Sequence, residues 1–174
     1  MKKAMLVAWH NSASESMAPI FSRMNKEENW NPTLVGYHPA ITGPDGREGV
    51  FDRRKFPYIK VADEPSGVTL TRMEEIVNEI NPDVIIGGSS PPGSRGISVA
   101  PEQLAFQVAR KNGIPSLSVI DYWLIQNRYD GPSKDERLKY LPNRIAALDE
   151  EHSKREMVEQ GIPADIIVPT GNPQ

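Results

Sequence analysis

The stretch "TLTRMEEIVNEINPDVIIGGSS" (residues 69–90) decides the fold class, because it joins a helical pattern directly to a strand pattern. One apolar face repeats at helical spacing and consists of Met73, Ile76, Val77 and Ile80. Asn81-Pro82 then stops the helix, since proline lacks the N–H that another turn needs. Residues 83–90 follow at once and are predicted to form a strand. A helix that leads straight into such a strand is the repeating unit of α/β proteins.

The same alternation extends in both directions from this stretch. "AMLVAWH" (4–10) is a continuous apolar run, as expected for a strand buried on both faces. Further strands are expected over residues 33–38, 58–63, 115–121, 144–149 and 165–171, and further helices over 17–28, 101–112 and 150–160. Strands joined by helices of this length require right-handed parallel crossovers. The sequence therefore predicts an α/β fold, a Rossmann-like three-layer sandwich around a mostly parallel sheet of about six or seven strands.

Local signals place the ends of these helices. Thr71 and Glu74 have the spacing of a capping box, which predicts where the helix over 69–80 begins. Pro19 is expected in the first turn of the first helix, where proline is tolerated. Asp149 is predicted to cap the last helix and Gly161 to follow its end.

Two segments break the alternation. Residues 38–57 contain the turn Gly43-Pro44-Asp45-Gly46 between short β-like runs, which predicts a hairpin or a mobile loop. Residues 126–142 are charged and are predicted to be irregular. With 174 residues, 38% of them hydrophobic, the chain is expected to form a single Rossmann-like domain over residues 1–174. The hairpin or loop is then an insertion at about residues 38–57.

Composition argues against several classes of protein. A formal net charge of -3 disfavours a nucleic-acid binder, which would carry a basic stripe. The absence of cysteine removes disulfides, thiolate metal ligands and cysteine nucleophiles, and it fits a cytoplasmic location. No run approaches the ~18 apolar residues of a membrane span. His10, His38 and His152 lie on separate elements without metal-ligand spacing, so neither a metal nor another cofactor is expected.

Polar residues that directly follow the predicted strands are the candidates for a functional site, because α/β sheets bind ligands beyond the carboxyl ends of their strands. Asp121 follows an apolar strand and precedes two aromatic residues, an arrangement suited to proton transfer or to hydrogen bonds with sugar hydroxyls. We predict that Asp121 is the catalytic residue. The predicted substrate-binding residues are His10, Asn11, Ser89, Ser90, Arg95, Tyr122 and Glu150.

Each candidate also has a purely structural interpretation. His10 can be an ordinary loop histidine, and Asp121 can cap the turn after its strand. The glycine- and serine-rich segment 87–96 can cradle an anion with backbone N–H groups, although it lacks the spacing of a P-loop. Its alternative is a flexible loop in which Gly87 and Gly88 allow tight packing.

The C-terminal stretch "LPNRIAALDEEHSKREMVEQGIPADIIVPTGNP" (141–173) resembles the end of the N-terminal domain of GT-B-type sugar-nucleotide enzymes. That group contains the UDP-N-acetylglucosamine 2-epimerase-like proteins and related glycosyltransferases. Further segments that resemble the family are "MAPIF" (17–21), "EEIVNEINPDVIIGGSS" (74–90) and "IPSLSVIDYWL" (114–124). The resemblance covers most of the chain except residues 38–57 and 126–140.

This resemblance implies one half of a GT-B fold, with the C-terminal nucleotide-binding domain absent from this chain. In the family that second domain supplies most contacts to the nucleotide, and the N-terminal domain faces the acceptor. The implied partners are a nucleotide sugar, a sugar or glycolipid acceptor, and a C-terminal domain or partner subunit. The implied activity is that of a glycosyltransferase or 2-epimerase-like enzyme in envelope polysaccharide or glycolipid synthesis, with the chain inactive alone.

Compared position by position, the resemblance is mixed. The family's epimerases have an aspartate after the fourth strand, where this chain has Ser89-Ser90, and an arginine in the first loop, where it has Asn11 or Ser12. They have a glutamate after the fifth strand, where Asp121 keeps a carboxylate. This pattern favours a glycosyltransferase or a diverged relative over a true epimerase. The alternative is a free-standing Rossmann-like binding module or a subunit of a split transferase, which would expose an apolar patch.

Overall fold

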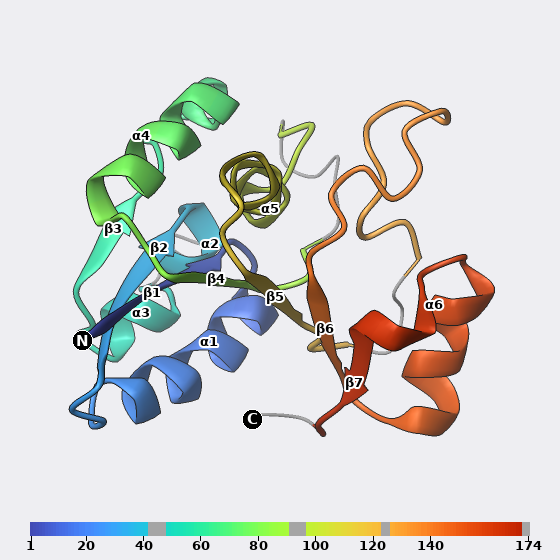
Figure 1. The fold of residues 1–174 in the computed structure, drawn as a ribbon. Helices are drawn as coiled ribbons and strands as arrows, with labels where there is room; N and C mark the ends of the chain where they lie inside the picture. Colours follow the sequence, from blue (N-terminus) through green and yellow to red (C-terminus); the bar gives the residue numbers. More distant parts are fainter. Residues whose placement is uncertain (42–47, 91–96, 123–125, 172–174) are drawn as a thin grey trace.

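A seven-stranded sheet runs through the chain, and all of its strand pairs are parallel (Figure 1). The computed structural model describes residues 1–41, 48–90, 97–122 and 126–171. The strands are β1 (Lys2–Ala8), β2 (Trp30–Gly36), β3 (Tyr58–Lys60), β4 (Val84–Gly87), β5 (Ser116–Val119), β6 (Arg144–Ala147) and β7 (Ile167–Pro169). Their order in the sheet is β3-β2-β1-β4-β5-β6-β7. The predicted α/β sandwich around a parallel sheet is confirmed.

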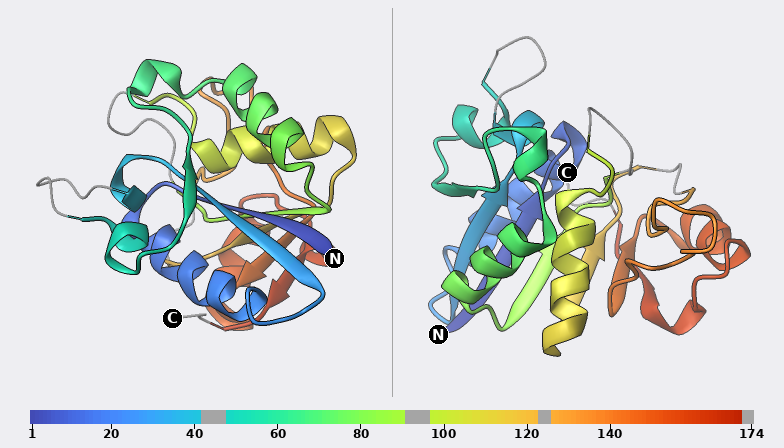
Figure 2. Two further views of the ribbon diagram at one scale, coloured as in Figure 1. Left: turned by 90° about the vertical axis from the view of Figure 1, so that its left-hand side faces the viewer. Right: turned by 90° about the horizontal axis from the view of Figure 1, so that it is seen from above.

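Helices lie on both faces of the sheet (Figures 1 and 2). One face carries α1 (Asn11–Met24), α2 (His38–Ile41) and α3 (Val50–Arg53). The other carries α4 (Leu70–Ile80), α5 (Pro101–Asn112) and a continuous helical stretch of η2 (Glu150–Lys154) and α6 (Arg155–Glu159). The short 3-10 turns are η1 (Pro65–Gly67) and η3 (Ala164–Ile166). β1 leads into α1 on one face, and its neighbour β4 leads towards α5 on the other. The chain therefore leaves these two adjacent strands towards opposite faces of the sheet.

The core is divided between the two faces because alternate strand residues point to opposite sides of the sheet. Met5 of β1 belongs to the cluster that includes the buried faces of α4 and α5. Leu6, the next residue, belongs to the cluster of α1 and α3. A third cluster joins α5, β6 and α6 through Phe106, Ile145 and Met157. The carboxyl ends of β1, β4 and β5 are thereby held on a rigid scaffold.

The first helix begins at Asn11 rather than at residue 17, so Pro19 lies inside the helix and not in its first turn. Residues 11–16 are rich in serine, a mediocre helix former, and local propensity therefore predicts a loop. In the fold, Ala13, Ser14 and Ser16 are buried. The Ser14 hydroxyl also donates to the His10 carbonyl at 2.8 Å. Packing of these small side chains outweighs the local propensity.

The start of α4 also differs from the prediction. Thr69 is the N-cap, and its hydroxyl oxygen accepts the Arg72 N–H at 3.1 Å. The capping box predicted at Thr71 and Glu74 is therefore wrong, because Thr71 already lies inside the helix. The expected apolar face is present, since Met73, Ile76, Val77 and Ile80 are all buried.

The hairpin predicted within residues 38–57 is wrong for the described part of this segment, which forms the two short helices α2 and α3. The turn at 43–46 lies outside the described residues. Phe51 of α3 is fully buried, and its ring lies 3.1 Å from the position that a Cβ at Gly36 would take. Burial of this aromatic side chain folds the insertion onto the sheet, an effect that the turn signal does not reveal.

Residues 126–142 contain neither helix nor strand, as predicted, but hydrogen bonds hold them against α5. The Gln103 amide donates to the carbonyls of Arg128 and Asp130 at 2.9 and 3.3 Å. The Arg110 guanidinium donates to the Lys139 carbonyl at 3.0 Å. The segment therefore has a defined conformation beside the carboxyl edge of the sheet.

Candidate functional site

The candidate site lies at the carboxyl edge of the sheet, around β1, β4 and β5. The loops after β1 and β4 leave towards opposite faces there, which is where open α/β sheets form ligand crevices. Six of the eight predicted site residues, His10, Asn11, Ser89, Ser90, Asp121 and Tyr122, follow these three strands in the described part of the chain. Topology thus gathers residues that are far apart in the sequence.

Asp121 and Ser89 form the centre of this site. The Ser89 hydroxyl donates to Asp121 Oδ1 at 2.9 Å, which joins the end of β4 to the end of β5. Ser89 is buried, whereas Asp121 is partly exposed. The Arg128 guanidinium donates to the Ser89 carbonyl and so holds the same segment in place. Asp121 is thus an oriented carboxylate with access to solvent, as a general base or hydroxyl-binding group requires.

Glu102 is a site residue that the sequence analysis missed. It lies in the first turn of α5, and its side chain is only 1% exposed. Glu102 Oε1 accepts the Trp9 N–H at 2.9 Å and the Ser90 hydroxyl at 2.6 Å. Ser90 Oγ in turn accepts the His10 N–H at 3.4 Å. One carboxyl group therefore ties the loop after β1 to the loop after β4.

The environment of Glu102 favours its neutral form. Burial raises the pKa of Glu102 from 4.5 to about 7; the nearby Asp121 carboxylate acts in the same direction, while hydrogen bonds from Ser90 and from the backbones of Glu102 and Trp9 oppose the rise. Its Oε2 atom is buried and makes no hydrogen bond among the described residues. A carboxyl group in this state can hold or release a proton near neutral pH.

A signal for Glu102 exists in the sequence but has a simpler interpretation. An acidic residue after Pro101 in the first turn of a helix normally favours the positive end of the helix dipole. The sequence alone gives no indication that this turn is buried, because the contacts come from residues after β1 and β4. Long-range packing rather than local pattern makes Glu102 part of the site.

Gly87 and Gly88 allow the close packing that surrounds Glu102. A Cβ at Gly88 would lie 2.4 Å from the Ala13 Cβ and 3.4 Å from Glu102 Oε1. A Cβ at Gly87 would lie 2.8 Å from the Phe106 ring. The interpretation of these two glycines as sites of tight packing therefore agrees with the geometry.

Gly88→Ala is expected to destabilise the protein by about 2 kcal/mol, because the added methyl group overlaps α1 and neither backbone can move freely. Urea unfolding followed by circular dichroism measures this loss. In the background of Ala13→Gly, which removes the opposing methyl group, the same substitution is expected to cost clearly less. Equal costs in the two backgrounds would contradict the overlap.

The other predicted residues have more varied surroundings. His10 is the N-cap of α1, and its ring lies 4.4 Å from the Trp9 ring between centroids. Asn11 is exposed at the first position of that helix. Tyr122 is 53% exposed and directly follows Asp121 in the chain. Arg95 lies outside the described residues.

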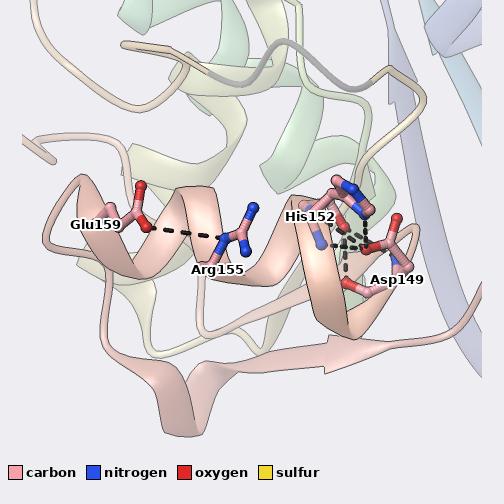
Figure 3. A network of polar contacts seen from close by, with 5 residues as sticks. Asp149, His152, Arg155 and Glu159 are labelled. Atoms are coloured by element: carbon pink, nitrogen blue, oxygen red, sulfur yellow. Dashed lines mark hydrogen bonds and ion pairs between the residues drawn. The ribbon is translucent and has the colours of Figure 1, made fainter.

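Glu150 belongs to a separate polar network after β6. Asp149 caps η2 as predicted, because its Oδ1 accepts the N–H groups of His152 and Ser153 at 2.6 and 3.2 Å (Figure 3). Glu150 is exposed and pairs with Lys154 at 2.8 Å. These contacts stabilise the start of a helix, and a binding role for Glu150 stays a prediction.

No group of three or more His, Asp or Glu side chains in the described part of the chain is placed to hold a metal ion. None of the helices among the described residues is long and apolar enough to cross a membrane.

No family model and no curated protein matches this chain. Solved structures do match. The UDP-GlcNAc 2-epimerase of Neisseria meningitidis matches with a TM-score of 0.69 and 15% identity, over 98% of this chain and 47% of the epimerase. The chain has the fold of one half of a GT-B enzyme. The epimerase of Methanocaldococcus jannaschii gives a TM-score of 0.66 and 16% identity, over 98% of this chain and 45% of the enzyme.

A further solved structure shows the same relation. Acinetobacter baumannii MurG matches with a TM-score of 0.60 and 13% identity, over 100% of this chain and 47% of MurG. The chain thus spans less than half the length of each of these GT-B enzymes. The resemblance inferred from the sequence motifs is confirmed for the fold.

Proposed function

We propose that this chain is the N-terminal, acceptor-side half of a GT-B enzyme that acts on a nucleotide sugar. One observation supports this most strongly: the whole parallel sheet matches half of such enzymes, and an oriented carboxylate, Asp121, stands at its carboxyl edge. The matching Neisseria epimerase was solved with UDP-GlcNAc bound. The reaction is glycosyl transfer or a 2-epimerase-like conversion, in envelope polysaccharide or glycolipid synthesis in the cytoplasm.

Asp121 is the acid–base or hydroxyl-orienting group in this proposal. In glycosyl transfer, its carboxylate takes the proton from the acceptor hydroxyl while that oxygen bonds to the anomeric carbon and the nucleoside diphosphate departs. The Ser89 hydroxyl holds the carboxylate in one orientation through Oδ1. The other oxygen of Asp121 is then directed to the substrate. Glu102 keeps the loops that carry Ser89 and His10 in register.

The remaining predicted residues bind substrate in this proposal. They are His10, Asn11, Ser89, Ser90, Arg95, Tyr122 and Glu150. A C-terminal domain, in the same polypeptide or as a partner subunit, supplies the nucleotide contacts. The acceptor is a sugar or glycolipid that enters between the two halves.

The alternative, a subunit of a split transferase or a free-standing binding module, has less support. It predicts an exposed apolar patch on the face that docks a partner. Among the described residues, the exposed large apolar side chains are Met1, Tyr122, Val158 and Val168, which come from four separate segments. These side chains give no specific support to a docking patch.

The complete product of the natural reading frame, together with the partner subunit where the second domain is a separate chain, is incubated with UDP-GlcNAc to test the proposal. If UDP is released only after a sugar or glycolipid acceptor is added, the enzyme is a transferase. If an epimerised nucleotide sugar forms without acceptor, the enzyme is an epimerase. We expect one of these products from the complete protein and neither from residues 1–174 alone. Turnover by residues 1–174 alone, or no product from the complete protein with a panel of nucleotide sugars and acceptors, would contradict the proposal.

A further inference from the structure

A cavity of about 720 Å³ opens on the segment that connects β5 to β6. This volume is typical of small-molecule sites, which span ~300–1,000 Å³. Its polar lining residues are Ser98, Asn127, Asp130, Ser133, Lys134 and Arg137. Most of them lie within residues 126–140, where the sequence motifs of the GT-B family are not found. The ligand must therefore be inferred from the chemistry of the lining.

The wall of the cavity is fixed before any ligand binds. The Gln103 amide holds the carbonyls of Arg128 and Asp130 against α5. Asp130 Oδ1 accepts the Leu138 N–H at 2.8 Å, and the Gly131 N–H donates to the Glu136 carbonyl at 2.7 Å. These bonds close residues 130–138 into a turn whose polar side chains face a common space. Such preorganisation lowers the entropic cost of binding.

The charges on this wall favour an anion. Among the described residues, Lys134 and Arg137 are the two cations that line the cavity. Lys134 makes no hydrogen bond or ion pair with the other described residues, whereas the Arg137 guanidinium donates to the Gln160 carbonyl and keeps further N–H groups for a ligand. Asp130 is the only lining acid among the described residues, and its Oδ1 is already engaged by a backbone N–H. Glu136, which is not part of the lining, is paired with Lys139 and does not neutralise Lys134. The lining therefore presents two cations to a ligand.

We propose that this cavity binds a phosphorylated sugar, with its phosphomonoester at Lys134 and Arg137. Near neutral pH a phosphomonoester carries close to two negative charges, which two cations match. The hydroxyls of Ser98 and Ser133, the Asn127 amide and the second oxygen of Asp130 offer donors and acceptors for sugar hydroxyls. A ligand with one anionic end and several hydroxyls uses both halves of this lining.

The cavity is distinct from the Asp121 site but adjacent in the chain. Arg128 lies between the lining residues Asn127 and Asp130, and its guanidinium donates to the Ser89 carbonyl. The segment 127–130 therefore contacts both the cavity and the turn that orients Asp121. Binding in the cavity does not require turnover at Asp121, so the two proposals are tested separately.

Calorimetric titration of the full chain with glucose 1-phosphate at pH 7.5 and low salt tests the cavity. We expect saturable binding, and about ten-fold weaker binding of glucose and of the phosphodiester glycerophosphoinositol, which lack a dianionic group. Inorganic phosphate is expected to bind and to compete. Affinity for glucose 1-phosphate is expected to fall below about pH 6, where the monoester gains a proton.

Substitutions locate the binding. Lys134→Gln and Arg137→Gln are each expected to weaken glucose 1-phosphate about ten-fold. Lys26→Gln, at an exposed lysine after α1, is the matched control and is expected to change nothing. Asp121→Asn is expected to bind normally, so failure of the proposed enzymatic function leaves this result unaffected. The assignment would be overturned if neither glucose 1-phosphate nor inorganic phosphate bound. It would also be overturned if the diester bound as tightly as glucose 1-phosphate, or if Lys134→Gln left the affinity for glucose 1-phosphate unchanged.

Discussion

Asp121→Asn is expected to lower the turnover number of the complete enzyme by roughly 10³-fold, with little change in KM. Asparagine keeps the shape of the side chain, and its amide oxygen still accepts the Ser89 hydroxyl, which donates to Oδ1 at 2.9 Å in the native protein. It lacks a carboxylate that takes up a proton from the substrate. The loss therefore falls on the chemical step and not on substrate binding. Steady-state kinetics on the complete polypeptide measure both constants.

Two further variants sharpen this result. Ser89→Ala keeps the Asp121 carboxylate but removes the hydroxyl that orients it, so a smaller loss, on the order of ten-fold, is expected. Asp165→Asn makes the same chemical change at an exposed residue of η3, which precedes β7 at the opposite edge of the sheet, and is expected to leave turnover unchanged. An Asp121→Asn enzyme that retains turnover close to that of Asp165→Asn would remove the proposed acid–base role.

Glu102→Gln is expected to abolish a pH-dependent loss of stability in the isolated chain. Burial and the Asp121 carboxylate raise the pKa of Glu102 from 4.5 to about 7, so the folded state holds this proton more tightly than the unfolded chain does. The resulting stability is fully present below about pH 4.5 and is lost as the pH rises through about 7. Its size is roughly 3 kcal/mol.

Urea unfolding at several pH values between about 4 and 8 gives the free energies of unfolding of the wild type and the variant. In the difference between them, the contributions of the other titrating groups cancel. Glutamine keeps an oxygen for the Trp9 N–H and the Ser90 hydroxyl but carries no charge at any of these pH values. As the pH rises through this range, the free energy of unfolding of Glu102→Gln is therefore expected to increase relative to that of the wild type. Glu159→Gln, at an exposed ion pair with Arg155, is the control for the substitution itself. A difference that is constant with pH would contradict the buried, protonated state of Glu102.

Part of the candidate site could be predicted because strand ends are local features. The apolar run before Asp121 and the polar residues after β4 indicate where strands stop, and in a parallel sheet all such ends meet at one edge. The hydrogen bond between Ser89 and Asp121 could not be predicted, because it depends on which strands are neighbours. Glu102 was missed for the same reason, since its partners lie in other loops.

Local pattern failed where tertiary packing outweighed it. The serine-rich start of α1 is helical because its small side chains are buried, and α3 forms where a turn signal predicted a hairpin because Phe51 is buried. In both places, the free-energy difference that arises from intrinsic propensity is smaller than the free energy gained by burying side chains. A serine in a helix costs about 0.5 kcal/mol relative to alanine, whereas burial of a phenylalanine contributes about 2–3 kcal/mol.

The sequence by itself determined the α/β class, the order of the seven strands and of the longer helices, and the position of a carboxylate at the end of β5. These follow from hydrophobic periodicity and from glycine and proline, which act over a few neighbouring residues. Only the tertiary structure decided which strands pair, where α1 begins, how the 126–142 segment folds, and that Glu102 lies buried beside Ser90. These depend on contacts between residues distant in the chain, such as Trp9 and Glu102, whose energies no local pattern contains.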